Sequence, residues 1–251
     1  MIEVKNISKI YNNKTVVDDV SFTIEKGKVT SFIVLNGAGK STILSIITRL
    51  LDAEFGEVLI ENKKITDYSC RELAKKIAIL KQSNNIDLKL TIRELVGFGR
   101  FPHSQGNLNE EDNMFIDKAI KYMKLEDIQN KYIDELSGGQ RQRAYIAMVI
   151  AQNTEYILLD EPLNNLDMYN SVQMMKVIRR LCDELGKTVI LVMHDINFAS
   201  CYSDNIVAFK NGKIKEIGIT ENIIKKNVLE KIYDMKFDIR EINNKSICIY
   251  F

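Results

Sequence analysis

The sequence predicts an α/β protein whose central sheet is largely parallel. Apolar, strand-like runs recur along the chain, and helical stretches separate several of them, an alternation typical of β-α-β units. One of these runs, Val29–Leu35, is almost continuously apolar, as expected of a strand that is buried on both faces. At 251 residues the chain is long enough to bury one substantial core or two closely joined lobes.

The expected elements begin with an antiparallel pair. Residues 2–10 and 15–25 alternate apolar and polar side chains on either side of Asn12-Asn13, which predicts two half-buried strands joined by a turn. The apolar stretch 41–51 is expected to be a helix packed under a sheet. Further strands are expected at 57–61, 77–81, 156–160, 188–193 and 205–210.

Between about residues 87 and 154 the pattern contains helices only, and this predicts a helical lobe inserted in the α/β core. These helices are expected at 91–97, 110–123 and 139–151. Asn211-Gly212 is a strong hairpin signal and Asn243-Asn244 a weaker one. Residues from about 218 to 251 are expected to form a C-terminal extension of a single domain.

Composition excludes some function classes. The 35 basic and 34 acidic residues leave a net charge of +1, which argues against a dedicated nucleic-acid binder because no global field attracts polyanions. The four cysteines are scattered without metal-ligand spacing and are expected to be reduced thiols. No apolar stretch approaches the roughly 20 residues needed to cross a bilayer, so any membrane role is expected to depend on a partner.

A glycine-rich loop supplies the first chemical motif. Residues 36–42, Asn-Gly-Ala-Gly-Lys-Ser-Thr, follow the apolar strand and open a helix, so their backbone N–H groups can close around phosphate oxygens. Lys40 is expected to contact the β and γ phosphates of a nucleotide, and the Ser41 hydroxyl to bind Mg²⁺. We expect Asn36, Gly37, Ala38, Gly39 and Thr42 to complete the cradle.

The loop departs from the phosphate-loop pattern at one position. The glycine expected five residues before Gly39 is Val34, followed by Leu35. If that position requires a glycine-only conformation, valine costs about 1–3 kcal/mol and Val34→Gly should tighten ATP binding. If it does not, Val34 extends the buried strand.

Polar side chains also follow three other expected strands. The run 156–160 ends in Asp160 and Glu161, where the first carboxylate could hold Mg²⁺ and the second could polarise the water that attacks the γ-phosphate. His194 follows the strand at 188–193 and could hydrogen-bond the γ-phosphate, although a histidine in such a place is usually structural. Gln82 is placed to sense Mg²⁺ and the attacking water.

The segment 136–140, Leu-Ser-Gly-Gly-Gln, supplies a second anion site. It places a hydroxyl, two glycines and a carboxamide at the start of a helix, where free backbone N–H groups favour an anion. Two anion sites in one chain suggest that two copies share a nucleotide between them.

Taken together, these motifs resemble the ATP-binding subunits of ABC transporters over essentially the whole chain. The resemblance implies a P-loop NTPase fold of the ABC type, with a RecA-like core, an antiparallel β subdomain and an inserted helical lobe. It identifies residues 36–42 as Walker A, 136–140 as the signature, and Asp160 with Glu161 as the end of Walker B. It further implies that Tyr11 stacks on adenine and that Gln82 is the Q-loop glutamine. Residues 164–167 correspond to the D-loop and His194 to the switch histidine.

The resemblance also implies how the site works and what it binds. Two subunits close head to tail, so that Ser137, Gly138 and Gly139 of one contact the γ-phosphate held by Lys40 of the other. Gln140 and Asp167 join the same nucleotide site. ATP and Mg²⁺ are the implied cofactors, with Ser41, Gln82 and Asp160 implied around the metal. The implied partners are a second copy, integral membrane permease subunits and an extracellular substrate-binding protein, with no nucleic acid, at the cytoplasmic face of the cell membrane.

A further stretch narrows the resemblance. Residues 99–106, Gly-Arg-Phe-Pro-His-Ser-Gln-Gly, look like a segment of the ATPases of iron-siderophore and vitamin B12 importers. Three further pieces, residues 79–84, 125–152 and 159–168, most resemble ferric siderophore importers of the petrobactin type in Gram-positive bacteria. His103 could belong to this family segment or could simply be a solvated loop histidine. It is not expected to bind a metal.

Other functions stay open at this point. Manganese, zinc or cobalamin could be the cargo, because an ATP-binding subunit never touches it. A non-transport ABC ATPase acting on chromosomes or ribosomes is disfavoured, since no heptad run lies between Lys40 and Ser137. An inactive regulatory subunit is suggested by Val34 but opposed by the presence of Glu161, Gln82 and His194.

Overall fold

The computed structural model describes residues 1–34, 39–82 and 88–250. Contacts divide the chain into a first compact unit, residues 1–68 with 179–251, and a second, residues 69–178. Asn36, Gly37 and Ala38 of the expected phosphate loop lie outside the described residues. The description of the chain as one domain with an inserted lobe stays a prediction.

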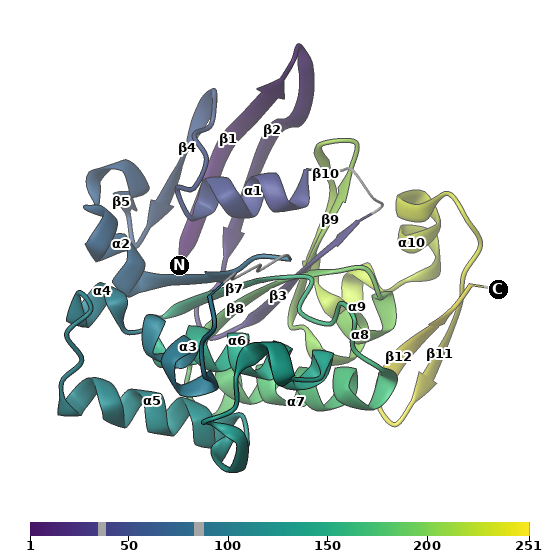
Figure 1. The fold of residues 1–251 in the computed structure, drawn as a ribbon. Coiled ribbons are helices and arrows are strands. Elements are labelled where there is room, and N and C mark those ends of the chain that lie inside the picture. Colours follow the sequence, from purple (N-terminus) through teal and green to yellow (C-terminus); the bar gives the residue numbers. More distant parts are fainter. Residues whose placement is uncertain (35–38, 83–87, 251) are drawn as a thin grey trace. The chain divides into compact units, whose positions relative to one another are not determined.

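The first unit contains the expected antiparallel subdomain (Figure 1). Buried and more exposed residues alternate along its two long strands, which matches the sequence pattern. Asn12 and Asn13 join these strands with φ angles of 45° and 62°, the left-handed region that asparagine tolerates. The strands run in the order β2-β1-β4-β5, namely β2 (Lys14–Ile24), β1 (Ile2–Tyr11), β4 (Phe55–Ile60) and β5 (Lys63–Lys64).

A second set of strands in this unit forms the parallel core. Strands β8, β3 and β9 run parallel, and β10 pairs antiparallel with β9 through the expected turn at Asn211-Gly212. Every residue of β8 is buried, which explains why its sequence is apolar without alternation. The order is β10-β9-β3-β8, with bounds Lys213–Ile219, Asn205–Lys210, Val29–Val34 and Thr188–Met193.

The first helix is shorter than the sequence predicted. Helix α1 spans Lys40–Ile47 rather than 41–51. Arg49 adopts the left-handed conformation with φ 55°, and the Leu50 N–H bonds back to the Ser45 carbonyl over 2.8 Å. This arrangement ends the helix as a Schellman-type cap does, with arginine in the place that glycine usually takes.

The C-terminal extension also belongs to the first unit. Its two strands form the hairpin expected from Asn243-Asn244, and both asparagines have positive φ. Helix α8 (Ile196–Tyr202) precedes β9 in the chain and contacts β12. The elements of the extension are α9 (Thr220–Ile223), α10 (Lys226–Tyr233), β11 (Asp238–Ile242) and β12 (Lys245–Ile249).

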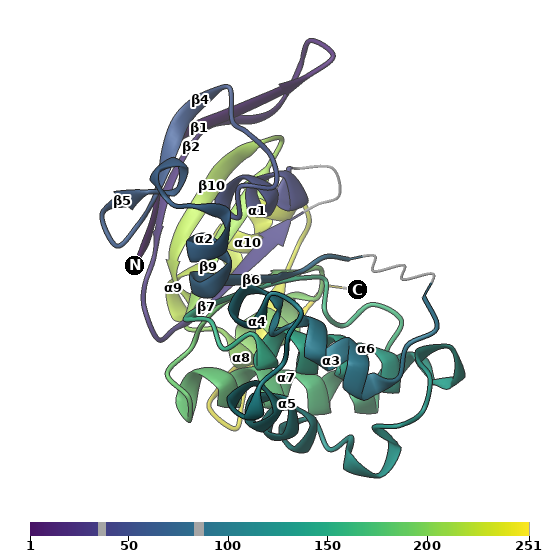
Figure 2. The same cartoon turned by 60° about the vertical axis from the view of Figure 1, so that its left-hand side comes forward.

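The second unit carries the expected helices, and α3, α5 and α6 pack against one another (Figure 2). Capping boxes, in which side chains satisfy the first backbone N–H groups of a helix, begin α2, α3, α5 and α6. Strands β6 (Ile77–Leu80) and β7 (Tyr156–Asp160) form a parallel pair. The helices are α2 (Cys70–Lys76), α3 (Ile92–Phe98), α4 (Phe101–Ser104), α5 (Glu110–Tyr122), α6 (Gly138–Ala151) and the larger part of α7 (Met168–Asp183), with 3-10 turns at Glu126–Ile128 and Ile133–Glu135.

The segment that begins at Gly99 packs on the end of α6. A side chain at Gly99 would lie 2.1 Å from the Met148 carbonyl oxygen, so only glycine allows this approach. The neighbouring guanidinium of Arg100 is buried and donates to the Ala151 carbonyl over 2.8 Å. The segment therefore closes the C-terminal end of the helix whose first residues follow the signature serine.

His103 is part of the same packing and is not a solvated loop histidine. Its Nε2 lies 3.0 Å from the Gln152 carbonyl oxygen, so this nitrogen carries the proton. Partial burial lowers the pKa of the imidazole, and the nearby Arg100 charge lowers it further. His103 therefore joins helix α4 to the residue that follows α6.

Candidate nucleotide site

At the described end of the phosphate loop, the backbone conformation and close packing require a glycine immediately before Lys40. Gly39 has φ 83° and precedes α1, and a Cβ there would lie 2.6 Å from the Val16 carbonyl oxygen. Lys40 is the first residue of α1 and only 6% of its surface is exposed. Ser41 is exposed and Thr42 half-buried in the same first turn, where unpaired helix N–H groups favour an anion.

Val34 belongs to the preceding strand. It is the last residue of β3 and lies opposite Phe209 of β9 in the parallel register. Of the two interpretations of this departure from the pattern, the structure supports strand extension. Paired strand residues have an extended backbone that valine adopts readily, so no glycine-only conformation is needed there. Leu35 lies outside the described residues.

The structure brings Lys40 and His194 together. The Lys40 Nζ lies 3.4 Å from Nδ1 and 3.3 Å from Nε2 of the imidazole. The reason is topological, because Lys40 follows β3 and His194 follows β8, and these strands are parallel neighbours. Residues that follow the carboxyl ends of adjacent parallel strands meet at one edge of a sheet.

Tyr11 lies at the end of β1 and 43% of its surface is exposed. The Lys9 ammonium lies 5.4 Å from the centre of its ring, within the range of a cation–π interaction. An exposed ring held in this way offers a flat surface for a base. The adenine-stacking role stays a prediction.

Gln82, Asp160 and Glu161 belong to the second unit. Asp160 ends the buried strand β7 with 6% of its surface exposed. Glu161 follows with φ 52°, an unusual backbone for a residue other than glycine and one that is often found at functional sites. Its Oε2 accepts hydrogen bonds from Gln82 Nε2 over 2.7 Å and from Asn164 Nδ2 over 2.6 Å.

The signature segment begins α6 as the sequence predicted. The Ser137 hydroxyl accepts from the Gln140 N–H over 3.3 Å, and Gln140 Oε1 accepts from the Ser137 N–H over 3.1 Å. Ser137 and Gly138 are exposed, which leaves the segment accessible to a ligand. A side chain at Gly138 would lie 3.4 Å from the Asn165 carbonyl oxygen, so the signature adjoins the D-loop.

Asp167 caps helix α7 in this structure. Its two carboxylate oxygens accept from the backbone N–H and the side-chain amide of Asn170, over 2.8 Å and 2.7 Å. Both hydrogen bonds lower the pKa of the Asp167 carboxyl group, and the bond from the Asn170 backbone has the larger effect. A contact of Asp167 with nucleotide stays a prediction.

Sequence reasoning missed the contacts that three amides make near these motifs. Asn164 contacts Glu161 directly, and Asn170 lies 3.2 Å from the position a Gly139 side chain would take. Gln142 Nε2 donates to the Pro162 carbonyl over 2.9 Å and so joins the signature helix to the turn after Glu161. The clustering of carboxamides within the motifs was the sequence signal that could have indicated these residues. Their contact partners become clear only in the structure.

The residues expected around Mg²⁺ suit that ion chemically. Ser41, Gln82 and Asp160 offer hydroxyl, carbonyl and carboxylate oxygens, the hard ligands that Mg²⁺ prefers. Within residues 1–34, 39–82 and 88–250, no three His, Cys, Asp or Glu side chains gather as a metal cage would require.

In the described part of the chain, no helix is both long enough and apolar enough to cross a bilayer.

Known proteins share the sequence and the fold. The sequence profile of the ABC transporter family matches residues 17–164. The petrobactin import ATP-binding protein YclP of Bacillus subtilis (strain 168) is 59% identical over 251 residues, covering 100% of both chains. FatE of Bacillus anthracis, also a petrobactin import ATP-binding protein, is 47% identical over 250 residues, again covering 100% of both.

A solved structure extends the likeness to three dimensions. The ATP-binding cassette MJ0796, solved as a dimer in a post-hydrolysis state with ADP and Pi, aligns with a TM-score of 0.77 and 33% identity. The alignment covers 88% of this chain and 99% of that one. The fold class expected from the sequence, a P-loop ABC-type ATPase, is confirmed.

Proposed function

Because the chain belongs to the ABC transporter family, we propose that it is the ATP-hydrolysing subunit of a bacterial importer for ferric siderophores. The family match and the full-length similarity to petrobactin import proteins carry this proposal. The chain retains every side chain that ATP hydrolysis is expected to require. The pairing of Val34 with the neighbouring strand argues against an inactive regulatory subunit.

In the proposed mechanism, one group of residues contacts the phosphates of ATP and another activates the attacking water. The buried Lys40 at the start of α1 would neutralise the β and γ phosphates, and His194 beside it would donate a hydrogen bond to the γ-phosphate. Glu161 would accept a proton from the attacking water, held in place by Gln82 and Asn164. Mg²⁺, when bound through Ser41, Gln82 and Asp160, would offset charge on the phosphate oxygens.

A second copy of the chain would complete the site. The exposed Ser137 and Gly138 at the start of α6 offer a hydroxyl and free N–H groups to a phosphate, while the chain has its own phosphate loop elsewhere. A head-to-tail dimer satisfies both motifs at once. The dimeric arrangement of the MJ0796 cassette supports this proposal.

Movement on ATP binding and hydrolysis would pass to permease subunits through the helices of the second unit. The protein would then act at the cytoplasmic face of the membrane, with an extracellular substrate-binding protein in the same system. The names of the curated relatives favour a siderophore over manganese, zinc or cobalamin as cargo.

Uptake in living cells tests the proposal. A strain lacking this gene should lose uptake of radioactive ferric petrobactin, and the wild-type gene should restore it. Glu161→Gln should not restore uptake, although the variant should be present in normal amounts. Normal uptake by the deletion strain would contradict the cargo, and restoration by Glu161→Gln would contradict the catalytic role.

A further inference from the structure

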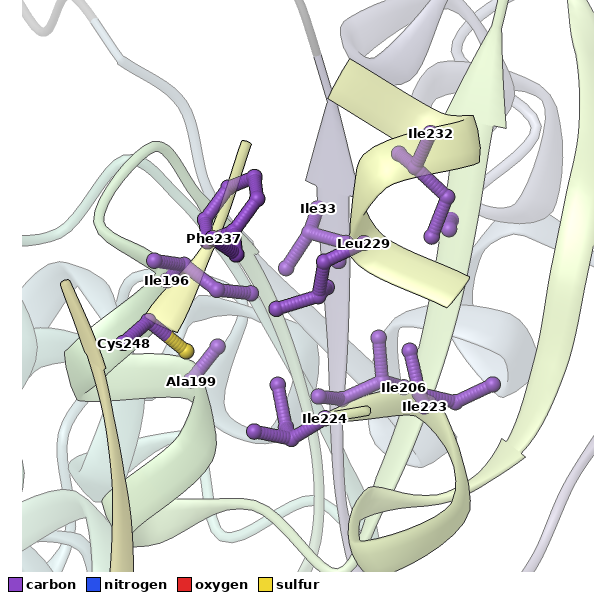
Figure 3. Packing of buried hydrophobic residues seen from close by; sticks show 11 residues of the cluster. Ile33, Ile196, Ala199, Ile206, Ile223, Ile224, Leu229, Ile232, Phe237 and Cys248 are labelled. Carbon is purple, nitrogen blue, oxygen red and sulfur yellow. The ribbon is translucent and has the colours of Figure 1, made fainter. Parts of the chain in front are cut away.

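The C-terminal extension packs on the two elements that lead to the phosphate site. Leu229, Ile232, Phe237 and Cys248 of the extension share one buried cluster with Ile33 and Ile196 (Figure 3). Ile33 is the penultimate residue of β3, which runs into the phosphate loop. Ile196 begins α8, two residues after His194.

A reciprocal pair of hydrogen bonds joins the first turn of α8 to strand β12. Asn197 Nδ2 donates to the Cys248 carbonyl over 3.2 Å, and the Cys248 N–H donates to Asn197 Oδ1 over 2.7 Å. One carboxamide therefore fills the edge of the hairpin as a neighbouring strand would. Ser200, one turn further along α8, donates to the Ser246 carbonyl over 2.6 Å.

The same turn is also fixed to the residue after the histidine. Asp195 is the N-cap of α8, and its Oδ1 accepts from the backbone N–H groups of Asn197 over 2.7 Å and Phe198 over 3.1 Å. A continuous set of bonds thus runs from Asp195 through Asn197 to Cys248. His194 is covalently joined to the first member of this set.

Helix α8 has only seven residues, and an isolated helix of that length is unstable in water. Its position must therefore come from tertiary contacts. We propose that Asn197 is a positioning residue for His194, acting by fastening the first turn of α8 to the C-terminal hairpin. The imidazole is thereby held beside the Lys40 Nζ, at the 3.3 Å and 3.4 Å separations seen here.

The inference rests on the proposed role of His194 in ATP hydrolysis. A misplacement of about 1 Å in a catalytic group can reduce rates by as much as about 100-fold. The thiol of Cys248 takes no part, because the hydrogen bonds use its backbone, and burial raises the pKa of that thiol to about 11. The extension is in this view a part of the catalytic scaffold.

Steady-state kinetics on the full-length protein test the proposal. Asn197→Ala should lower kcat for ATP hydrolysis about tenfold, the lower part of the range for misplacement, while the Kd for ATP stays within about twofold. Ser200→Ala is the matched control, since it removes a hydrogen bond between the same two elements further from His194, and should leave kcat unchanged. Asn197→Ser provides a milder variant if the alanine variant folds poorly.

A spectroscopic readout separates positioning from general loss of stability. The chain has only two histidines, His103 and His194, so histidine-selective isotope labelling gives two assignable imidazole signals. In Asn197→Ala and Asn197→Ser the His194 signal should shift, while the His103 signal should not. In Ser200→Ala both signals should stay in place.

Comparison with His194→Ala distinguishes a failure of the positioning role of Asn197 from a failure of the proposed role of His194. If His194→Ala is inactive but both Asn197 variants keep full kcat or an unmoved His194 signal, the positioning role is wrong. If His194→Ala keeps full kcat, the proposed role of His194 is wrong, and a shifted His194 signal in the Asn197 variants would still support the mechanical connection.

Discussion

Gln82 Nε2 donates a hydrogen bond to Glu161 Oε2 over 2.7 Å, and so joins the segment that follows β6 to the residue after β7. Asn164 donates to the same oxygen over 2.6 Å. Two carboxamides thus orient the carboxylate of a residue whose backbone is left-handed. In the proposed mechanism this carboxylate is the proton acceptor, and its orientation is set before the attacking water arrives.

Removal of the Asn164 amide should slow hydrolysis. A hydrogen bond to a charged group contributes roughly 1.5–3 kcal/mol, so Asn164→Ala is expected to lower kcat by about tenfold or more, since 1.4 kcal/mol corresponds to tenfold. KM for ATP should stay nearly constant because the amide contacts the base. Phosphate release measures the effect, with Asn130→Ala at an exposed turn as control. Unchanged kcat would show that Gln82 alone is sufficient.

Val34→Gly should leave ATP binding unchanged. Val34 lies in the paired strand β3, opposite Phe209, and the loop does not need glycine there. Glycine within a strand costs about 0.5–1 kcal/mol of stability, so the melting temperature should fall slightly. Titration with a fluorescent ATP analogue gives the Kd. Tighter binding by Val34→Gly would contradict the strand interpretation.

The buried ion pair in the second unit should be important for stability. Arg100 Nε donates to Asp112 Oδ1 over 2.8 Å, and each side chain is only 3% exposed. Asp112→Asn is expected to lower the free energy of unfolding by about 3–5 kcal/mol, because it leaves the arginine charge buried and uncompensated. Asp117 on the same helix pairs with Arg93 and is 61% exposed, so Asp117→Asn should cost less than about 1 kcal/mol. Urea denaturation at pH 7 compares the two.

The contribution of the same pair should depend on pH. Burial raises the pKa of the Asp112 carboxyl group, but hydrogen bonds from Arg100 and the Asn109 backbone outweigh this and leave the pKa below its usual value. The pair therefore contributes fully above the unfolded pKa of about 3.9, and its contribution is lost as the pH falls through the lower folded pKa. The difference in unfolding free energy between wild type and Asp112→Asn should narrow below about pH 4. A constant difference down to pH 3 would contradict the lowered pKa.

Local chemistry explains which features the sequence predicted well. The asparagine turns at residues 12–13 and 243–244 were predictable because only a few side chains tolerate positive φ. The capping box of Ser137 and Gln140 likewise depends on residues three positions apart. The end of α1 was not predictable, because Arg49 has no intrinsic preference for the left-handed conformation it adopts.

Contacts between distant residues account for what the sequence left out. Lys40 and His194 are 154 positions apart in the chain and meet because they follow the neighbouring parallel strands β3 and β8. The bonds from Gln142 to Pro162 and from Asn197 to Cys248 depend on tertiary packing. No periodicity or spacing in the sequence encodes these pairings.

ATP-dependent dimerisation is the most direct test of the shared nucleotide site. In the Glu161→Gln background, which should bind ATP without hydrolysing it, saturating Mg-ATP should convert the monomer to a dimer in sedimentation velocity. Adding Ser137→Ala should abolish the dimer. Adding Ser69→Ala should not, although Ser69 caps α2 with the same capping box that Ser137 forms on α6. A dimer that forms equally well with both serine variants, or a Glu161→Gln protein that stays monomeric in saturating Mg-ATP, would contradict the account.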